Sequence, residues 1–330
     1  MNRSVSTKAY QYIRIHIPAS QFTFDDSRFT SLPLRLMTKI SRAHAAVLGA
    51  NFIFGANYAI VKYITPAWLH PYALNVVRIL ASLSLFWLLF LFKPGKVPLQ
   101  RKHLPRFMIC ALTGVVINQI FFIKGVSLTT PIHSALLSLA TPIFITLIAA
   151  WLLREGFTWF KFLGLALGIG GAALLILLKD ATHTGSNMLL GDVMVIINAI
   201  SYAFYLVLVR PLMQHYSGIQ VLRWIFTFGS LVILPFGMHE FLNTDWVAFG
   251  FSQWAALAAV AIGATFLAYL LNVYGINIIG ASATGAYIYT QPVFAAVIAV
   301  VFAGEHFSLV KLLAAILIFS GVYLANFRKA

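Results

Sequence analysis

The chain has 330 residues, of which 61% are hydrophobic and 9% are charged, and its formal net charge is +15. Soluble domains devote about a quarter of their residues to charge, so eight acidic and 23 basic side chains cannot give this chain a water-soluble surface. The composition therefore predicts an integral membrane protein. The basic residues lie between apolar segments, as they do in membrane proteins, which argues against nucleic-acid binding.

The first 43 residues form a polar segment without the apolar run that a secretory signal requires. We expect a polar cytoplasmic N-terminal tail over residues 1–43. A start codon assigned upstream of the true one, with Met37 as the alternative start, would explain residues 1–36 equally well.

Apolar segments of about 20 residues follow, which is the length that crosses a hydrocarbon layer of about 30 Å as a helix. They predict an all-α integral membrane protein with ten transmembrane helices, joined by loops too short to hold a soluble domain. The predicted helices cover residues 44–64, 71–92, 104–126, 131–153, 159–178, 191–210, 218–238, 252–275, 281–303 and 308–327.

The positive charges predict how these helices are oriented. Most of the 23 Lys and Arg residues fall on the same side as the N-terminus when the helices alternate in direction. Positive charge concentrates on the cytoplasmic side of membrane proteins, so both termini are expected in the cytoplasm of a bacterial-type inner (plasma) membrane. The opposite segments hold only Lys62, Lys124, Lys179 and Lys311.

Two segments of the chain resemble each other at an offset of 150 residues. TPIFITLIAAWLLREGFT (141–158) and QPVFAAVIAVVFAGEHFS (291–308) align without a gap and share a proline and a glutamate. The shared residues at the two ends of the match are Pro142 with Pro292 and Glu155 with Glu305.

This similarity predicts a five-helix unit that occurs twice, at 44–178 and 191–327. Because five is an odd number, the second unit would cross the membrane upside down relative to the first. Inverted repeats are typical of secondary transporters, in which two similar halves open a central site to each side in turn. A duplication without any transport role is the alternative.

With the openings NFIFGANYAIVK and GDVMVIINAISYAFYLVLVR, these features resemble the EamA-type branch of the drug/metabolite transporter superfamily, over about residues 40–327. The resemblance implies two intertwined five-helix bundles around a central cavity. It also implies efflux of amino acids or similar small metabolites, without identifying the compound.

Pro142 and Pro292 lie in the middle of their predicted helices, so each is expected to bend its helix. Matching bends near the middle of the membrane are a pointer to a transporter's binding site, although a bend can also serve packing alone. Neutral polar side chains at comparable depth are substrate-binding candidates, with hydrogen bonding between helices as the alternative. They are Asn51, Asn57, Asn118, Gln119, Ser138, Thr141, Asn198, Tyr202, Tyr287 and Gln291.

Arg78 and Arg223 are the two basic residues more than one turn from the ends of the predicted helices. An intramembrane arginine can pair with an anionic group of a transported molecule. The alternative, favoured by their distance from the helix centres, is that both reach the rim of the bundle and bond to carbonyls there.

No acidic residue is expected near the middle of the membrane, so we expect no coupling of transport through a central carboxylate. Facilitated diffusion, exchange, or weak coupling through His133 or an acid at the rim stays open. An intramembrane enzyme is disfavoured, because Asp192 has no second acid at its depth and His133 no assigned nucleophile. A non-transporting membrane scaffold is a further alternative.

A small-molecule metabolite and the lipid bilayer are the expected partners, with no metal ion or cofactor. Gly164, Gly168 and Gly171 of the segment GLALGIGGAAL are small residues that let helices approach closely. We expect them to pack inside the bundle rather than in a homodimer.

Overall fold

The structure is a computed structural model that describes residues 26–92, 97–153, 159–177, 187–304 and 308–326. All regular structure in these ranges is helical, as the sequence predicts. Glu155, Lys179, Glu305 and residues 1–25 of the predicted tail lie outside the described residues.

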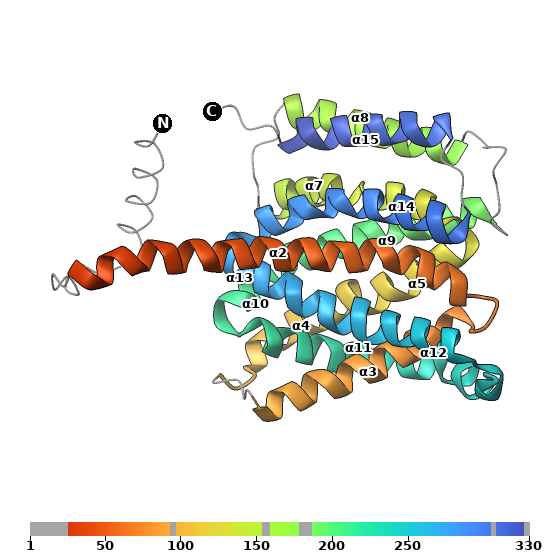
Figure 1. Ribbon diagram of the computed structural model, residues 1–330, viewed down its shortest axis with the longest axis horizontal. Coiled ribbons are helices and arrows are strands. Elements are labelled where there is room, and N and C mark those ends of the chain that lie inside the picture. Colours follow the sequence, from red (N-terminus) through yellow and green to blue (C-terminus); the bar gives the residue numbers. More distant parts are fainter. Residues whose placement is uncertain (1–25, 93–96, 154–158, 178–186, 305–307, 327–330) are drawn as a thin grey trace. The chain divides into compact units, whose positions relative to one another are not determined.

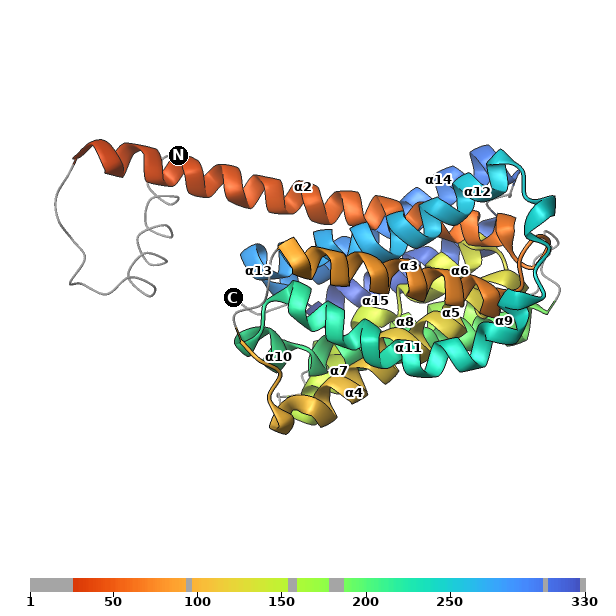
Figure 2. The ribbon, with the colours of Figure 1, turned by 90° about the horizontal axis from the view of Figure 1, so that it is seen from below.

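The chain divides into two compact units, residues 1–42 and Ala43–Ala330. Helix α2 (Asp26–Ile64) begins in the first unit and continues into the second. Within the second unit the helices run along a common direction (Figures 1 and 2), as helices that cross one bilayer do.

Besides the short 3-10 turn η2 (Arg101–His103), helix α2 is followed by seven helical elements in the described first half of the chain. The long ones are single helices, whereas the third predicted span is built from two α-helices with a π-helical stretch between them. These elements are α3 (Pro71–Phe92), α4 (Leu104–Ala111), η3 (Leu112–Ile117), α5 (Asn118–Leu128), α6 (Pro131–Ser138), α7 (Thr141–Leu153) and α8 (Trp159–Leu177).

The second half has a comparable series of elements. It again contains a span in which a π-helical stretch lies between two α-helices. The elements are α9 (Met188–Leu208), α10 (Arg210–His215), α11 (Gly218–Leu242), α12 (Phe251–Ala258), η5 (Ala259–Leu267), α13 (Ala268–Ala286), α14 (Gln291–Ala303) and α15 (Leu309–Asn326).

Six helical stretches in the described ranges are long and apolar enough to cross a membrane, and shorter apolar helices accompany them. Large apolar side chains such as Phe92 and Phe302 are exposed on the outside of the unit, as expected for a surface that meets lipid. The protein is therefore a multi-pass membrane protein. The six stretches are Thr38–Ile64, Pro71–Phe92, Arg101–Leu128, Met188–His215, Gly218–Leu242 and Phe251–Ile279.

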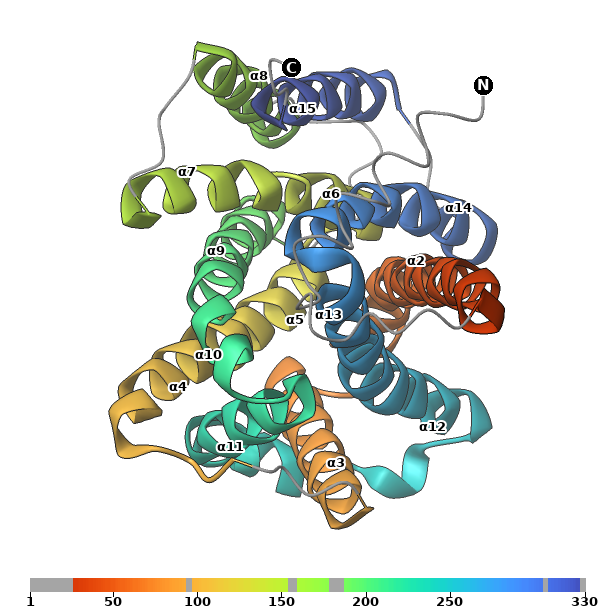
Figure 3. The same ribbon diagram turned by 90° about the vertical axis from the view of Figure 1, so that its left-hand side faces the viewer.

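Helices that occupy the same position in the two predicted repeats pack against each other. Helix α3 packs along α11, and α8 packs along α15 (Figure 3). The second contact is unusually close, because a Cβ atom on Gly321 would lie 2.5 Å from the carbonyl oxygen of Gly164. The glycine segment therefore packs inside the chain, as the sequence predicts.

Pro142 and Pro292 begin new helices instead of bending continuous ones. The predicted helix 131–153 is interrupted at Leu139 and Ala140, and Pro142 is the second residue of α7. Proline fits this place because its missing N–H would have no partner in the first turn of a helix. The prediction of a mid-helix bend is corrected to a break with a restart.

The predicted boundary between the eighth and ninth helices is also wrong. Helix α13 continues past residue 275 to Ala286, and the break comes at the short 3-10 turn η6 (Tyr287–Thr290). Pro292 again lies in the first turn of the next helix, α14. The two halves therefore interrupt the chain at equivalent prolines, although the helix before each break differs in length.

Candidate functional site

Arg78 lies in the interior of the protein, on the eighth residue of α3. Its side chain is 4% exposed, and its Nε donates a hydrogen bond of 2.7 Å to the Thr265 hydroxyl. The Thr265 hydroxyl in turn donates to the carbonyl of Val260 at 2.9 Å. The Nη1 atom of Arg78 is buried and has no hydrogen-bond partner among the described residues. One edge of the guanidinium is therefore fixed while another is left open.

The π-helical stretches position the residues around Arg78. Thr265 belongs to the π-helical stretch η5, and its side-chain hydroxyl donates to the carbonyl of Val260, five residues earlier. The other π-helical stretch, η3, leads directly into Gln119 of α5. Shifted by the 150 residues of the predicted repeat, residues 112–117 fall on 262–267, inside η5. Such wide turns are frequent at functional sites.

Tyr269 connects Arg78 with Gln119. Its hydroxyl lies near the Arg78 guanidinium and beside the Gln119 amide. Gln119 is 1% exposed, and neither atom of its amide completes a well-formed hydrogen bond within the described part of the chain. We call Arg78, Gln119, Thr265 and Tyr269 the Arg78 cluster.

Helix α2 contributes a further polar group next to this cluster. Phe54 packs edge-on against Tyr269 with a centroid separation of 6.1 Å, and Asn57 lies one helical turn further along α2. Tyr58, the next residue, packs on Phe122, which is one turn from Gln119. The Oδ1 atom of Asn57 is buried and unpartnered among the described residues. Asn57 and Gln119 therefore offer unused amide groups on neighbouring helices.

The other amide candidates hold helices together. The Gln291 amide donates to Asn51 Oδ1 at 2.7 Å, which joins α14 to α2. Asn198 donates to the backbone carbonyl of Asn118 at 2.8 Å, which joins α9 to α5. For these residues the structure shows the interhelical bonding that the sequence left as the alternative.

The remaining candidates are distributed over several helices. Tyr287 is hydrogen-bonded to His44 at 2.8 Å, and Ser138 donates to the carbonyl of Ser134 in its own helix. Thr141 is buried at the start of α7. Tyr202 is partly buried, stacks on Tyr205 and interacts electrostatically with Tyr269. Tyr202 is therefore the one of these four that lies near the Arg78 cluster.

Arg223 has surroundings unlike those of Arg78. Its guanidinium lies 3.6 Å from the centroid of the Phe90 ring and 4.8 Å from that of Trp87. The aromatic faces provide a cation–π environment for its charge. Trp87 is nine residues after Arg78 on α3, which places the two arginine sites about 13 Å apart along that helix. The two arginines, both 4% exposed, therefore belong to separate environments.

A second buried polar group joins α6 and α9. His133 Nδ1 lies 2.8 Å from Asp192 Oδ1, and the Thr129 hydroxyl donates to the same oxygen at 2.9 Å. The sequence analysis missed this pairing, because nothing local relates residues so far apart in the chain. Thr129 and Asp192 both approach the same nitrogen of His133, Nδ1. The geometry is that of a buried histidine–carboxylate pair.

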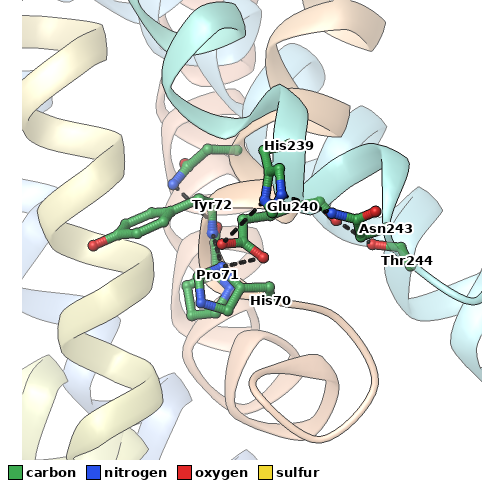
Figure 4. A network of polar contacts seen from close by, with 8 residues as sticks. His70, Pro71, Tyr72, His239, Glu240, Asn243 and Thr244 are labelled. Carbon is green, nitrogen blue, oxygen red and sulfur yellow. Dashed lines mark hydrogen bonds and ion pairs between the residues drawn. The ribbon is translucent and has the colours of Figure 1, made fainter.

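A third network joins the start of α3 to the last turn of α11 (Figure 4). His70 Nδ1 lies 3.9 Å from Glu240 Oε2 and accepts a hydrogen bond from the Tyr72 backbone N–H. Burial lowers the pKa of His70 below its ordinary value, against the opposing effect of the Glu240 charge; the positive charge of Lys124 adds to the lowering.

Within the described ranges no group of three or more His, Cys, Asp and Glu residues could hold a metal ion.

Comparison with known proteins identifies relatives of this chain. A sequence model of the EamA-like transporter family matches it twice, over residues 41–177 and 189–327. An uncharacterized transporter of Bacillus subtilis (strain 168), YetK, is 25% identical over 298 residues, which are 89% of each chain.

Further relatives come from other organisms. A probable terminal-alkyne amino-acid exporter of Streptantibioticus cattleyicolor is 28% identical over 234 residues, covering 69% of this chain and 75% of the exporter. The WAT1-related protein At3g53210 of Arabidopsis thaliana is 24% identical over 323 residues, covering 88% of this chain and 86% of the Arabidopsis protein. A solved crystal structure has the same fold, with a TM-score of 0.59 at 20% identity, and covers 86% of this chain and 96% of its own.

Proposed function

The chain belongs to the EamA-like transporter family, and we propose that it is a carrier that exports or exchanges amino acids or similar small metabolites. The amino-acid class comes from the Streptantibioticus cattleyicolor relative, which is named a probable terminal-alkyne amino-acid exporter. The multi-pass helical fold of this chain supports a role in moving a solute across a membrane.

We further propose ten transmembrane helices arranged as two inverted five-helix repeats, 44–178 and 191–327, with both termini in the cytoplasm of the plasma membrane. The double match of the family model supports the repeat. So do the packing of equivalent helices and the two π-helical stretches at the same offset. Two such halves can open a central site alternately to each side.

The Arg78 cluster is the observation that carries this proposal. Thr265 lies in the middle of the helical stretch Phe251–Ile279, and Arg78, the eighth residue of Pro71–Phe92, is buried beside it instead of reaching the rim. Buried polar atoms without partners are costly, and they are costlier in lipid, where water cannot serve them. The unpartnered atoms of Arg78, Gln119 and Asn57 are therefore explained by a polar solute that binds there and completes their hydrogen bonds.

Arg78, Asn57, Gln119 and Tyr202 are thus the proposed substrate contacts. Asn51, Asn118, Asn198 and Gln291 take part in bonds between helices, which could rearrange during transport. An intramembrane enzyme is a weaker proposal, because the relatives of this chain are named as transporters.

Transport is tested with the purified protein in liposomes. We expect radiolabelled amino acids to exchange across vesicles that contain the protein faster than across protein-free vesicles. The compounds to test first are those that accumulate in cells lacking the gene. If no amino acid and no accumulated metabolite moves faster with the protein present, the proposed function is wrong.

The inverted arrangement has its own test. In a Cys110→Ala background, single cysteines at Gly156 and His306 are labelled in intact cells with a membrane-impermeant maleimide. We expect labelling from outside at position 306 and not at position 156. Labelling of both from the same side would contradict the inverted repeat and leave the transport assay unaffected.

A further inference from the structure

The guanidinium of Arg78 is buried without a counterion in the part of the chain that the structure describes. The described acids of the second unit have other partners. Asp192 bonds to His133, Glu240 lies by His70, and Asp245 accepts from backbone N–H groups that follow it. A charge buried without a partner is strongly unfavourable, so the site is complete only when an anion is bound.

The orientation of Arg78 determines what kind of anion fits. Thr265 holds Nε at 2.7 Å, which fixes the plane of the guanidinium and leaves the edge formed by the Nη atoms available. That edge presents two parallel N–H donors, which match the two oxygens of a carboxylate. A single guanidinium provides one positive charge, which suits a singly charged anion.

The other unpartnered atoms determine what the rest of the solute carries. The amide oxygens of Gln119 and Asn57 are buried acceptors without partners in the described residues. They can accept hydrogen bonds from an ammonium or another N–H group. Tyr269, between Arg78 and Gln119, and Phe54 provide aromatic surface beside them.

Building on the proposed function, we propose that the Nη edge of Arg78 binds the carboxylate of the transported solute, while the Gln119 and Asn57 amides bind its N–H donors. The solute class is thus a small monocarboxylate with a nitrogen donor, of which an amino acid is the simplest member. Thr265 is a positioning residue that holds Arg78 in its binding orientation.

The test compares three kinds of probe on the purified protein. Neutral L-amino acids carry both groups, their amides lack the carboxylate, and the corresponding carboxylic acids lack the amino group. Binding is measured by ligand-induced thermal shift, and transport by exchange in liposomes. We expect at least one amino acid to bind, its amide to lose binding, and its deaminated acid to bind more weakly than the amino acid.

The variants separate the role of Arg78 from a general effect of buried charge. Arg78→Gln is expected to weaken amino-acid binding about tenfold or more. Arg78→Lys keeps the charge and loses the planar fork, so it is expected to bind more weakly than wild type and better than Arg78→Gln. Arg223→Gln removes an equally buried arginine at another place and is expected to bind as wild type does.

The ligand-free protein adds a measurement that does not depend on binding. Because Arg78 lacks a counterion, Arg78→Gln is expected to unfold at a temperature no lower than wild type, whereas loss of a purely structural residue would lower it. Amides that bind as well as amino acids, or an unaltered affinity in Arg78→Gln, would overturn the inference. If wild type neither binds nor moves any probe, it is the proposed function that fails.

Discussion

His133 Nδ1 lies 2.8 Å from Asp192 Oδ1, and this contact joins a helix of the first half of the chain to a helix of the second. Both side chains are buried, and Thr129 provides a further hydrogen bond to the carboxylate. Asp192 is a buried acid, which the sequence did not predict. It lies near the start of α9 rather than at the middle of this helix. The pair therefore fixes the contact between α6 and α9.

Removing one partner of this pair should destabilise the protein more than removing both. His133→Leu leaves a buried carboxylate without one of its hydrogen-bond partners and is expected to cost about 1–3 kcal/mol. The double variant His133→Leu/Asp192→Leu replaces the pair with apolar groups and should be closer to wild type in its thermal unfolding midpoint. A double variant less stable than His133→Leu would show that the pair is not the source of the loss.

The pKa of His70 should depend on two neighbouring charges in opposite directions. Glu240 raises this pKa and Lys124 lowers it, while burial gives the largest lowering. Glu240→Gln is therefore expected to lower the pKa further, and Lys124→Gln to raise it. NMR titration of labelled histidine in nanodiscs measures both shifts, with His70→Asn identifying the resonance. Shifts of the opposite sign would contradict the network in Figure 4.

The same pKa predicts a direction for stability. The pKa of His70 in the folded protein is below its value of about 6.5 in the unfolded chain. At pH values between these two pKa values, the unfolded chain therefore binds more protons than the folded protein does. Stability contributed by neutral His70 is present above about pH 6.5 and is lost as the pH falls through the folded pKa. The unfolding midpoint of wild type should fall more steeply over this range than that of His70→Asn.

The contact between α8 and α15 depends on glycine at position 321. A Cβ atom there would lie 2.5 Å from Gly164 O and 2.6 Å from Gly168 N, both backbone atoms that cannot move alone. Gly321→Ala should therefore destabilise the protein by about 1–3 kcal/mol. Gly170→Ala is the matched control, because its Cβ would meet nothing within 4 Å and stability should change by less than about 0.5 kcal/mol. Equal effects of the two would contradict the packing.

Much of this arrangement could be predicted from the sequence, because composition and helix length are governed by the membrane itself. The helical fold and most helix positions follow from apolar runs, and Arg78, Asn57 and Gln119 stand out as polar residues within them. Thr265 and Tyr269 were missed, because threonine and tyrosine are common in apolar helices. Their spacing of four residues, in a charge-free stretch, was the one available signal.

Features that depend on contacts between distant segments could not be predicted. Whether a chain bends at Pro142 or restarts there depends on how the preceding residues satisfy their backbone groups. Here Leu139 and Ala140 bond three residues back, which ends α6 before the proline. The pairing of His133 with Asp192 likewise has no local sequence pattern. Arg78 and Arg223 looked equivalent in sequence, and only their neighbours distinguish them.

The hydroxyl of Thr265 should matter for solute binding through Arg78 alone. Thr265→Val keeps the shape of the side chain but removes the acceptor that holds Arg78 Nε, so the guanidinium loses its fixed orientation. We expect carboxylate binding to weaken about fivefold, which corresponds to about 1 kcal/mol, the net effect of one typical hydrogen bond. Thr265→Ser retains the hydroxyl and should bind as wild type does, with the same amino-acid probe and thermal shift. If Thr265→Ser and Thr265→Val weaken binding equally, the hydroxyl does not position Arg78. The role assigned to Thr265 would then be wrong.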